Sequence, residues 1–213
     1  MCGRYEAGQK QKIAEAFHVS VTLEDHYFGA NVECAPGSIQ PVICIKDGER
    51  QIVEMRWGFK FPDRLAFNAR SDKLISSPFW KERLTQRCIV PASSMLEWKK
   101  TSAGPKPKYR LSVKGRQVIG MAGLWGPWKN PKTGQWEDTF AVITDDPNTK
   151  MSEIHDRQAI ILEPRDYAEW LNESERPPLH LLRILQDDDL VIDPIQVETV
   201  DEKPEPPQLG LFG

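Results

Sequence analysis

The chain has 213 residues, of which 39% are hydrophobic and 28% charged, and its formal net charge is −3. This length fits one domain of generous size or one domain with a tail, and the composition predicts a packed core beneath a charged surface. No apolar leader follows Met1 and no apolar run approaches membrane-spanning length, so we expect a soluble, cytoplasmic and nucleoid-associated protein without a membrane partner.

The first half of the chain predicts one helix followed by several strands. Ile13, Ala16 and Phe17 give residues 10–19 helical spacing. Two strands around the turn Asp47-Gly48 come next, and residues 74–84 suggest a short helix around Pro78. The strands on either side of that turn are residues 42–45 and 52–57, and further strands are expected at residues 88–91, 95–98, 108–113 and 118–124.

The second half predicts more strands and two helices. A hairpin loop at residues 130–134 precedes a strand at 139–144, and residues 159–162 form another short apolar strand. Pro164 suits the first turn of a helix that runs to about Glu173, and residues 178–185 suggest a second helix. A last strand is expected at residues 195–200. The fold class is therefore α+β, a β-rich single domain over residues 1–200.

Charge is distributed unevenly along the chain. Residues 166–213 hold 12 acidic and 3 basic side chains, which leaves 19 of the 31 acidic and 25 of the 28 basic residues in 1–165, a net charge of +6 there. The first three-quarters of the chain therefore suit either a cationic face for nucleic acid or an ordinary mixed surface. Residues 201–213 are acidic and proline-rich, which predicts a disordered tail.

The four cysteines are Cys2, Cys34, Cys44 and Cys88, and no two of them form a C-x-x-C pair. They indicate reduced thiols instead of a disulfide framework or a zinc site, and we expect no metal and no cofactor. Cys2 differs from the others because removal of Met1 would leave it with a free α-amine beside its thiol. Such a 1,2-aminothiol condenses with an aldehyde, first as an imine and then as a five-membered thiazolidine ring. An α-amine pKa of ~8 and a thiol pKa of ~8.5 leave a usable neutral amine at neutral pH.

Four separated segments together resemble one family. They are Met1-Cys2-Gly3-Arg4, Phe67-Asn68-Ala69-Arg70-Ser71, the run from Arg87-Cys88-Ile89-Val90-Pro91-Ala92 to Leu96-Glu97-Trp98, and Ile154-His155-Asp156-Arg157. In this order, with cysteine at position 2, they resemble the SRAP family, the SOS-response-associated peptidase domain. The resemblance implies curved antiparallel sheets with peripheral helices, covalent cross-linking of abasic sites in single-stranded DNA, and self-removal of Met1.

The resemblance also assigns roles to site residues. Cys2 is the nucleophile, Glu97 the proton shuttle, and His155 the group that protonates the sugar oxygen as the ring opens. Asn68 is expected to orient the Cys2 amine. Each has a simpler alternative: Glu97 as a strand residue facing water, His155 as a structural histidine and Asn68 as a turn residue.

Four further residues are candidates for contacting DNA. Arg4, Arg70 and Arg157 suit phosphates that flank the lesion, and Trp98 suits stacking on a base. The alternatives are surface salt bridges for the arginines and core packing for the tryptophan.

Three features depart from the family pattern. Glu33 stands where an asparagine is usual, and a carboxylate there would repel a phosphate. Residues 58–67 lack the usual tryptophans of a DNA-wedging loop, for which Phe59 or Phe61 are possible substitutes. Ser93-Ser94-Met95-Leu96 precedes Glu97 in place of an Asp-Gly-aromatic-aromatic run.

Two other functions fit the same residues. Cys2, His155 and Glu97 permit a cysteine peptidase, and an inactive site would leave a non-catalytic single-stranded DNA-binding protein. In the tail, Gln208, Leu209, Leu211 and Phe212 resemble the short motif by which bacterial proteins bind the replicative sliding clamp. The alternative is a tail whose apolar residues dock on its own domain.

Overall fold

A computed structural model describes residues 3–29, 32–101, 104–174 and 176–195. Five strands in it form a closed barrel, because β12 (Trp136–Asp145) pairs with both ends of the order β4 (Glu49–Trp57), β3 (Ile39–Lys46), β8 (Arg87–Ala92) and β11 (Ile119–Lys129). The β12–β4 contact is parallel and the other four are antiparallel. The short strands β13 (Gln158–Ala159) and β7 (Asn68–Arg70) add to β12, and β14 (Ile161–Leu162) adds to β11.

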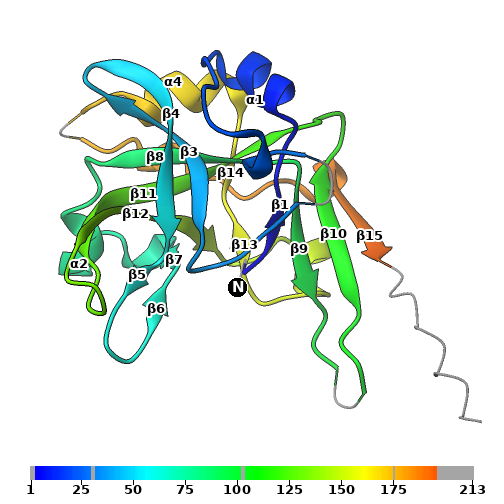
Figure 1. Ribbon diagram of the computed structural model, residues 1–213. Coiled ribbons are helices and arrows are strands. Elements are labelled where there is room, and N and C mark those ends of the chain that lie inside the picture. The colour runs from blue at the N-terminus through cyan, green and yellow to red at the C-terminus, as the bar shows by residue number, and fades with distance from the viewer. Residues whose placement is uncertain (1–2, 30–31, 102–103, 175, 196–213) are drawn as a thin grey trace, which may run out of the picture.

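A second, five-stranded antiparallel sheet lies beside the barrel (Figure 1). Its strand order is β15 (Leu190–Ile195), β10 (Lys108–Val113), β9 (Ser94–Trp98), β1 (Tyr5–Glu6) and β2 (Glu33–Cys34). A small hairpin of β5 (Phe59–Lys60) and β6 (Leu65–Ala66) projects from the end of β4. The fold is thus the predicted β-rich α+β domain.

The core has two parts. One cluster fills the barrel interior and continues onto the inner face of the five-stranded sheet, where Tyr5 and Trp57 meet at 5.1 Å between ring centroids. The second lies outside the barrel beneath α1 (Lys10–Phe17), α2 (Pro78–Lys81) and α4 (Tyr167–Leu171). The remaining helix, α3 (Thr149–Ser152), follows β12. None of the described helices is long and apolar enough to cross a membrane.

Three cysteines are buried as free thiols, and two of them lie side by side on neighbouring strands of the barrel. Cys44 lies opposite Cys88 in the β3–β8 register, and both are fully buried. Gly123 makes room for them, since a Cβ there would lie 2.7 Å from the Cys88 sulfur. Burial raises the pKa of Cys44 to about 11 and that of Cys88 well above its ordinary value. These thiols are therefore packing groups of low reactivity.

Most predicted strands are found, with boundaries shifted by a few residues. The β3–β4 hairpin turns at Asp47 and Gly48, whose φ angles of 55° and 77° match the Asp-Gly turn that its twist requires. The predicted strand 159–162 is interrupted at Ile160. That residue bonds instead to two strands of the barrel: its amide donates to the Ile143 carbonyl of β12, and its carbonyl accepts from the Ala122 amide of β11.

Two predicted helices are wrong in extent. Within residues 74–84 only Pro78–Lys81 is helical. The expected helix at 178–185 is reduced to a 3₁₀ turn at Leu179–Leu181, because the backbone leaves the helical region at Leu182, where φ is −78° and ψ is 76°. The Leu185 carbonyl accepts from Asn148 Nδ2 at 2.8 Å. The last described strand is Leu190–Ile195, an edge strand that tolerates Pro194, whereas residues 196–200 of the expected strand lie outside the described residues.

Candidate active site

The start of the described chain is held against β9. Tyr5 lies opposite Met95 in the antiparallel register, and the Leu96 amide donates to the Arg4 carbonyl at 3.0 Å. One further step of the same register brings Gly3 toward Glu97. Cys2 itself lies outside the described residues. Two residues after Cys2, the described chain is therefore bonded through Arg4 to Leu96, the residue before the predicted proton shuttle.

Glu97 faces the protein interior. Strand alternation places it on the same face of β9 as Met95, opposite Tyr109 of β10, and it is 5% exposed. Burial is the main cause that raises the pKa of Glu97 to about 7. The expectation of a strand glutamate facing water is thus not met. A carboxyl group with this pKa is present in both protonation states at neutral pH, as a general acid–base requires.

His155 follows α3 and has a defined tautomer. Its amide donates to the Met151 carbonyl at 2.9 Å, and its Nδ1 accepts from the Arg157 amide at 3.1 Å. Nδ1 also lies 2.8 Å from Asp156 Oδ1. The two contacts exclude one another, because Nδ1 accepts from the amide only when it carries no proton and donates to the carboxylate only when it carries one. Burial lowers the pKa of His155, which favours the neutral ring with its proton on Nε2.

Asn68 begins β7, which runs parallel to β12 with Asn68 opposite Val142. The segment is anchored by Trp57, whose Nε1 donates to the Phe67 carbonyl at 2.9 Å. The Trp57 ring also packs against Tyr5 of β1. A continuous set of contacts therefore connects the residue before Asn68 with the N-terminal strand.

The His155 segment is joined to the end of β9. Lys100 Nζ lies 3.2 Å from Asp156 Oδ2, and the charge of Asp156 contributes to the raised pKa of Glu97. These links bring together three segments far apart in sequence, those of Asn68, Glu97 and His155, near the N-terminal strand. In Figure 1, β1, β7, β9 and β13 lie in the same lower central region of the molecule.

The residues predicted to contact DNA differ in their surroundings. Arg4 is half-buried, and Arg70 is exposed with two hydrogen bonds of 2.9 and 3.0 Å to Asp72. Trp98 is half-buried with the Lys108 ammonium 5.2 Å from its ring centroid. Arg157, in contrast, is 8% exposed.

The Arg157 guanidinium is bonded within the protein. It donates to Asp146 Oδ1 at 2.5 Å and to the Thr144 carbonyl at 2.9 Å. These bonds tie the His155 segment to the end of β12. The geometry therefore favours a structural role for Arg157 over a phosphate contact.

Two departures from the family pattern take on a different meaning in the structure. Lys108 forms an ion pair with Glu33, which neutralises the carboxylate expected to repel a phosphate. Phe59 is fully buried against Phe79, Trp80 and Trp128, so it does not substitute for a DNA-wedging tryptophan.

Sequence reasoning missed Asn148. Its side-chain oxygen accepts from the backbone amide of Met151 at 2.7 Å and caps α3. Its backbone amide donates to Gln158 Oε1 at 3.1 Å. These bonds set the start of the turn that ends at His155. An asparagine directly before a short helical segment was the available signal.

A family model for SOS response associated peptidase (SRAP) matches residues 1–202. The chain belongs to the SRAP family. Among curated SRAP-like relatives, the abasic site processing protein YoqW of Bacillus subtilis is 32% identical over 196 residues, which cover 87% of each chain. The abasic site processing protein HMCES of Gallus gallus is 29% identical over 168 residues, covering 65% of this chain and 50% of that protein.

Solved structures support the same fold. A protein from Bacteroides thetaiotaomicron matches with a TM-score of 0.79 at 23% identity, covering 97% of both chains. A protein from Bordetella bronchiseptica matches with a TM-score of 0.76 at 22% identity, covering 92% of this chain and 100% of that one.

Proposed function

We propose that this SRAP protein processes abasic sites by forming a covalent thiazolidine cross-link between Cys2 and the lesion in single-stranded DNA. The observation that carries the proposal is the environment of Glu97, a buried carboxyl group with a pKa of about 7 beside the strand that follows Cys2. The names of the SRAP relatives, abasic site processing proteins, supply the substrate class.

The chemistry is a condensation that loses one water. Removal of Met1, which we propose the protein performs on itself, frees the α-amine of Cys2. The amine adds to the aldehyde carbon of the ring-opened sugar, and loss of the hydroxyl as water gives an imine. The thiol of Cys2 then adds to the imine carbon and its proton passes to the nitrogen, which closes the thiazolidine ring.

The described residues suit the proton transfers of this sequence. Glu97 accepts the proton that the Cys2 nitrogen loses as the neutral amine adds to the aldehyde, and it returns one to the departing hydroxyl, because its pKa lies close to neutral pH. His155 in its neutral form offers Nε2–H to the sugar oxygen that is released when the ring opens. Asn68 supplies an amide group to orient the Cys2 amine.

The test is intact-mass analysis of the purified protein, alone and after incubation with abasic single-stranded DNA. We expect the mature chain to begin at Cys2 and to gain the mass of the oligonucleotide minus one water. Cys2→Ala should form no heat-stable adduct, although an imine through its new α-amine should be trapped by borohydride. Cys34→Ala is the matched control. Because Cys34 is buried in β2, this variant should form the Cys2 cross-link normally.

DNA in which the abasic aldehyde has been reduced to an alcohol distinguishes the alternatives. A cross-linking protein binds this DNA without forming an adduct. Peptidase turnover would depend on the Cys2 thiol but not on an aldehyde, and a simple DNA-binding protein would form no adduct with either DNA. A full heat-stable adduct from Cys2→Ala would overturn the proposal.

We further propose that residues 208–212 bind a bacterial sliding clamp. Gln208, Leu209, Leu211 and Phe212 lie outside the described residues, and the support is their sequence alone. Leu211 and Phe212 would enter an apolar pocket of the clamp while Gln208 forms hydrogen bonds at its rim. The acidic, proline-rich residues before them suit a linker that presents the motif away from the domain.

A further inference from the structure

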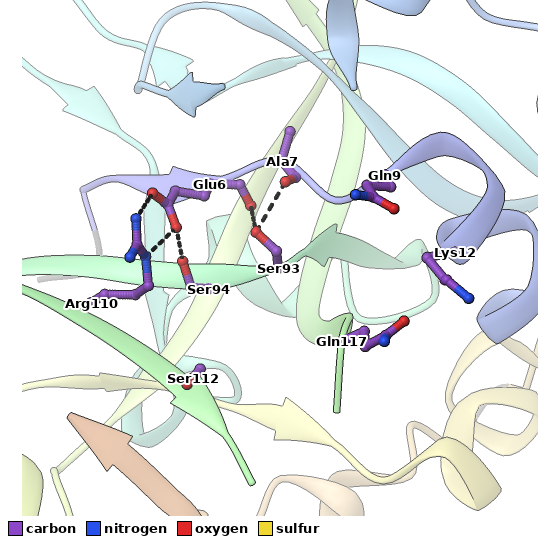
Figure 2. A pocket seen from close by; sticks show the side chains of 9 residues that line it. All are labelled: Glu6, Ala7, Gln9, Lys12, Ser93, Ser94, Arg110, Ser112 and Gln117. Carbon is purple, nitrogen blue, oxygen red and sulfur yellow. Dashed lines mark hydrogen bonds and ion pairs between the residues drawn. The ribbon is translucent and has the colours of Figure 1, made fainter. Parts of the chain in front are cut away.

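A polar pocket of about 410 Å³ opens on the outer face of the five-stranded sheet (Figure 2). Glu6 and Ser94, which are opposite one another in the β1–β9 register, line it. Because side chains alternate along a strand, they point away from the face that carries Tyr5 and Glu97. The pocket is therefore separate from the candidate active site.

The only acidic side chain in its lining is already neutralised. Glu6 is 6% exposed, and its carboxylate accepts from Arg110 Nε and Nη2, each at 2.7 Å, and from the Ser94 hydroxyl at 2.5 Å. This arrangement fixes the Arg110 guanidinium at one end of the pocket, as Figure 2 shows. No hydrogen bond to another described residue is formed by Nη1 of Arg110. The nearest further carboxylate by register is Asp193, opposite Arg110 on β15 and outside the pocket lining.

The other end of the pocket presents donors that the described part of the protein leaves largely unused. Lys12, Gln9 and Gln117 gather there in Figure 2, whereas Ser112 lies at the same end as Arg110. The one ion pair of Lys12 is a 3.4 Å contact with Glu15 at the surface, which contributes little. The pocket is therefore lined by a neutral Arg110–Glu6 pair with one open guanidinium nitrogen, by the cation Lys12, by two amides and by the Ser112 hydroxyl.

The first turn of α1 adds to this positive character. Gln9 stands at the N-cap of this eight-residue helix without a side-chain capping bond, and no acidic residue occupies the first turn. The helix dipole therefore places partial positive charge at the end that carries Gln9 and Lys12, both of which line the pocket.

We propose that this pocket binds a phosphate ester of about nucleotide size. Lys12, beside the first turn of α1, holds the phosphate, and Arg110 and the Ser112 hydroxyl at the other end bind polar groups of the sugar or base together with the two amides. The volume is within the range of small-molecule sites and exceeds what a single phosphate ion fills. The same chemistry fits a free nucleotide or a backbone phosphate of bound DNA, and neither requires the cross-linking reaction.

Titration calorimetry with deoxyadenosine monophosphate, and separately with an intact 12-nucleotide single strand, tests the proposal. Neither probe contains an aldehyde, so the result does not depend on Cys2 chemistry. We expect saturable binding of at least one probe, weakened about tenfold by Lys12→Gln or Arg110→Gln because each removes a charge-assisted hydrogen bond. Deoxyadenosine, which lacks the phosphate, should bind at least about tenfold more weakly than its monophosphate.

Lys132→Gln is the matched control, since it removes the same charge from an exposed turn outside the pocket. Loss of mononucleotide binding in the pocket variants identifies a free nucleotide as the ligand. Loss of strand binding alone identifies a DNA phosphate. Arg110→Gln removes the charged partner of the buried Glu6 carboxylate. If that variant unfolds, the binding of Lys12→Gln and Ser112→Ala is measured instead. Binding of both probes unchanged by the pocket variants, or no binding of either probe, overturns the proposal.

Discussion

The Arg157 amide donates to Nδ1 of His155 at 3.1 Å, and this bond decides which nitrogen of the neutral ring carries the proton. The same residue holds the segment in place through its guanidinium, which is bonded to Asp146 and the Thr144 carbonyl. His155 is therefore oriented from both the backbone and the side chain of one neighbour. The neutral ring held in this way carries its proton on Nε2.

Replacing Glu97 by Gln or His155 by Ala should slow cross-linking by about two to four orders of magnitude, since each removes a group proposed to transfer protons. Binding to DNA with a reduced abasic site should change little. Single-turnover cross-linking measured on denaturing gels gives the rate. Glu153→Gln is the matched control, because Glu153 is an exposed carboxylate near His155. Wild-type rates in both active-site variants would make Glu97 and His155 structural residues.

The raised pKa of Glu97 also predicts how stability depends on pH. Its pKa is about 7 in the folded protein against an ordinary value of 4.5, so folding favours the protonated carboxyl. The resulting stabilisation is complete below pH 4.5 and is lost as pH rises toward and through 7, by about 3 kcal/mol in total.

Denaturant unfolding of the wild type and of Glu97→Gln, followed from pH 5 to pH 8, measures this contribution as a difference. The difference removes the effect of other groups, such as Glu6. The bond to Arg110 is the chief cause that lowers the pKa of Glu6, so its contribution to stability changes with pH in the opposite direction to that of Glu97. Parallel stability curves for the two proteins would show that Glu97 titrates near its ordinary pKa and would remove the acid–base argument.

The sequence was sufficient for the general fold, because that depended on local signals, whereas the set of site residues came from the family resemblance and stays a prediction. Alternating apolar residues identified strands such as β10, predicted at 108–113 and found at Lys108–Val113. The short strands β1, β2 and β7 were missed because two or three residues carry no measurable periodicity. Their pairing depends on tertiary contacts, yet it is what brings Gly3 and Asn68 to the site.

The environment of each site residue could not be read from the sequence. Glu97 and Arg157 are charged residues that are most often exposed, and both are buried here. For Glu97, the apolar neighbours Leu96 and Trp98 are the one local signal that favours partial burial. For Arg157, the acceptors are Asp146 and a backbone carbonyl of β12, and only the fold shows that they lie within reach.

The clamp proposal predicts that a peptide of residues 201–213 binds a bacterial sliding clamp at micromolar affinity, since a flexible segment loses entropy when it binds. Fluorescence polarisation of the labelled peptide measures this. Changing Leu211 and Phe212 to Ala should abolish binding, whereas changing Glu202 and Glu205 to Gln should leave it within about threefold, because these charges lie in the linker. An unsaturable titration, or binding that survives loss of both apolar residues, would remove the clamp as a partner.

The arginines should separate into two classes. Arg4→Ala and Arg70→Ala should weaken single-stranded DNA binding and reduce the slope of log affinity against log salt by about 0.7 each, the value for one phosphate contact. Arg70 must exchange Asp72 for a phosphate, and this exposed pair costs little to open. Arg157→Ala should instead lower the free energy of unfolding by about 2 kcal/mol, because it leaves the Thr144 carbonyl without its buried charged donor, whereas the Asp146 side chain is 83% exposed and is hydrated by water.

Fluorescence anisotropy at several salt concentrations gives the slopes, and urea unfolding gives the stabilities. Arg165→Ala serves as the control for a removed surface charge, since its side chain is 80% exposed and forms only a 3.9 Å contact with Asp166. Arg157→Ala could instead reduce the slope of log affinity against log salt by about 0.7 and leave the free energy of unfolding unchanged. That result would show that the Arg157 guanidinium leaves Asp146 and binds a DNA phosphate. Unchanged slopes for Arg4→Ala and Arg70→Ala would place the DNA on a different surface, because two of the cations nearest the site would then make no phosphate contact.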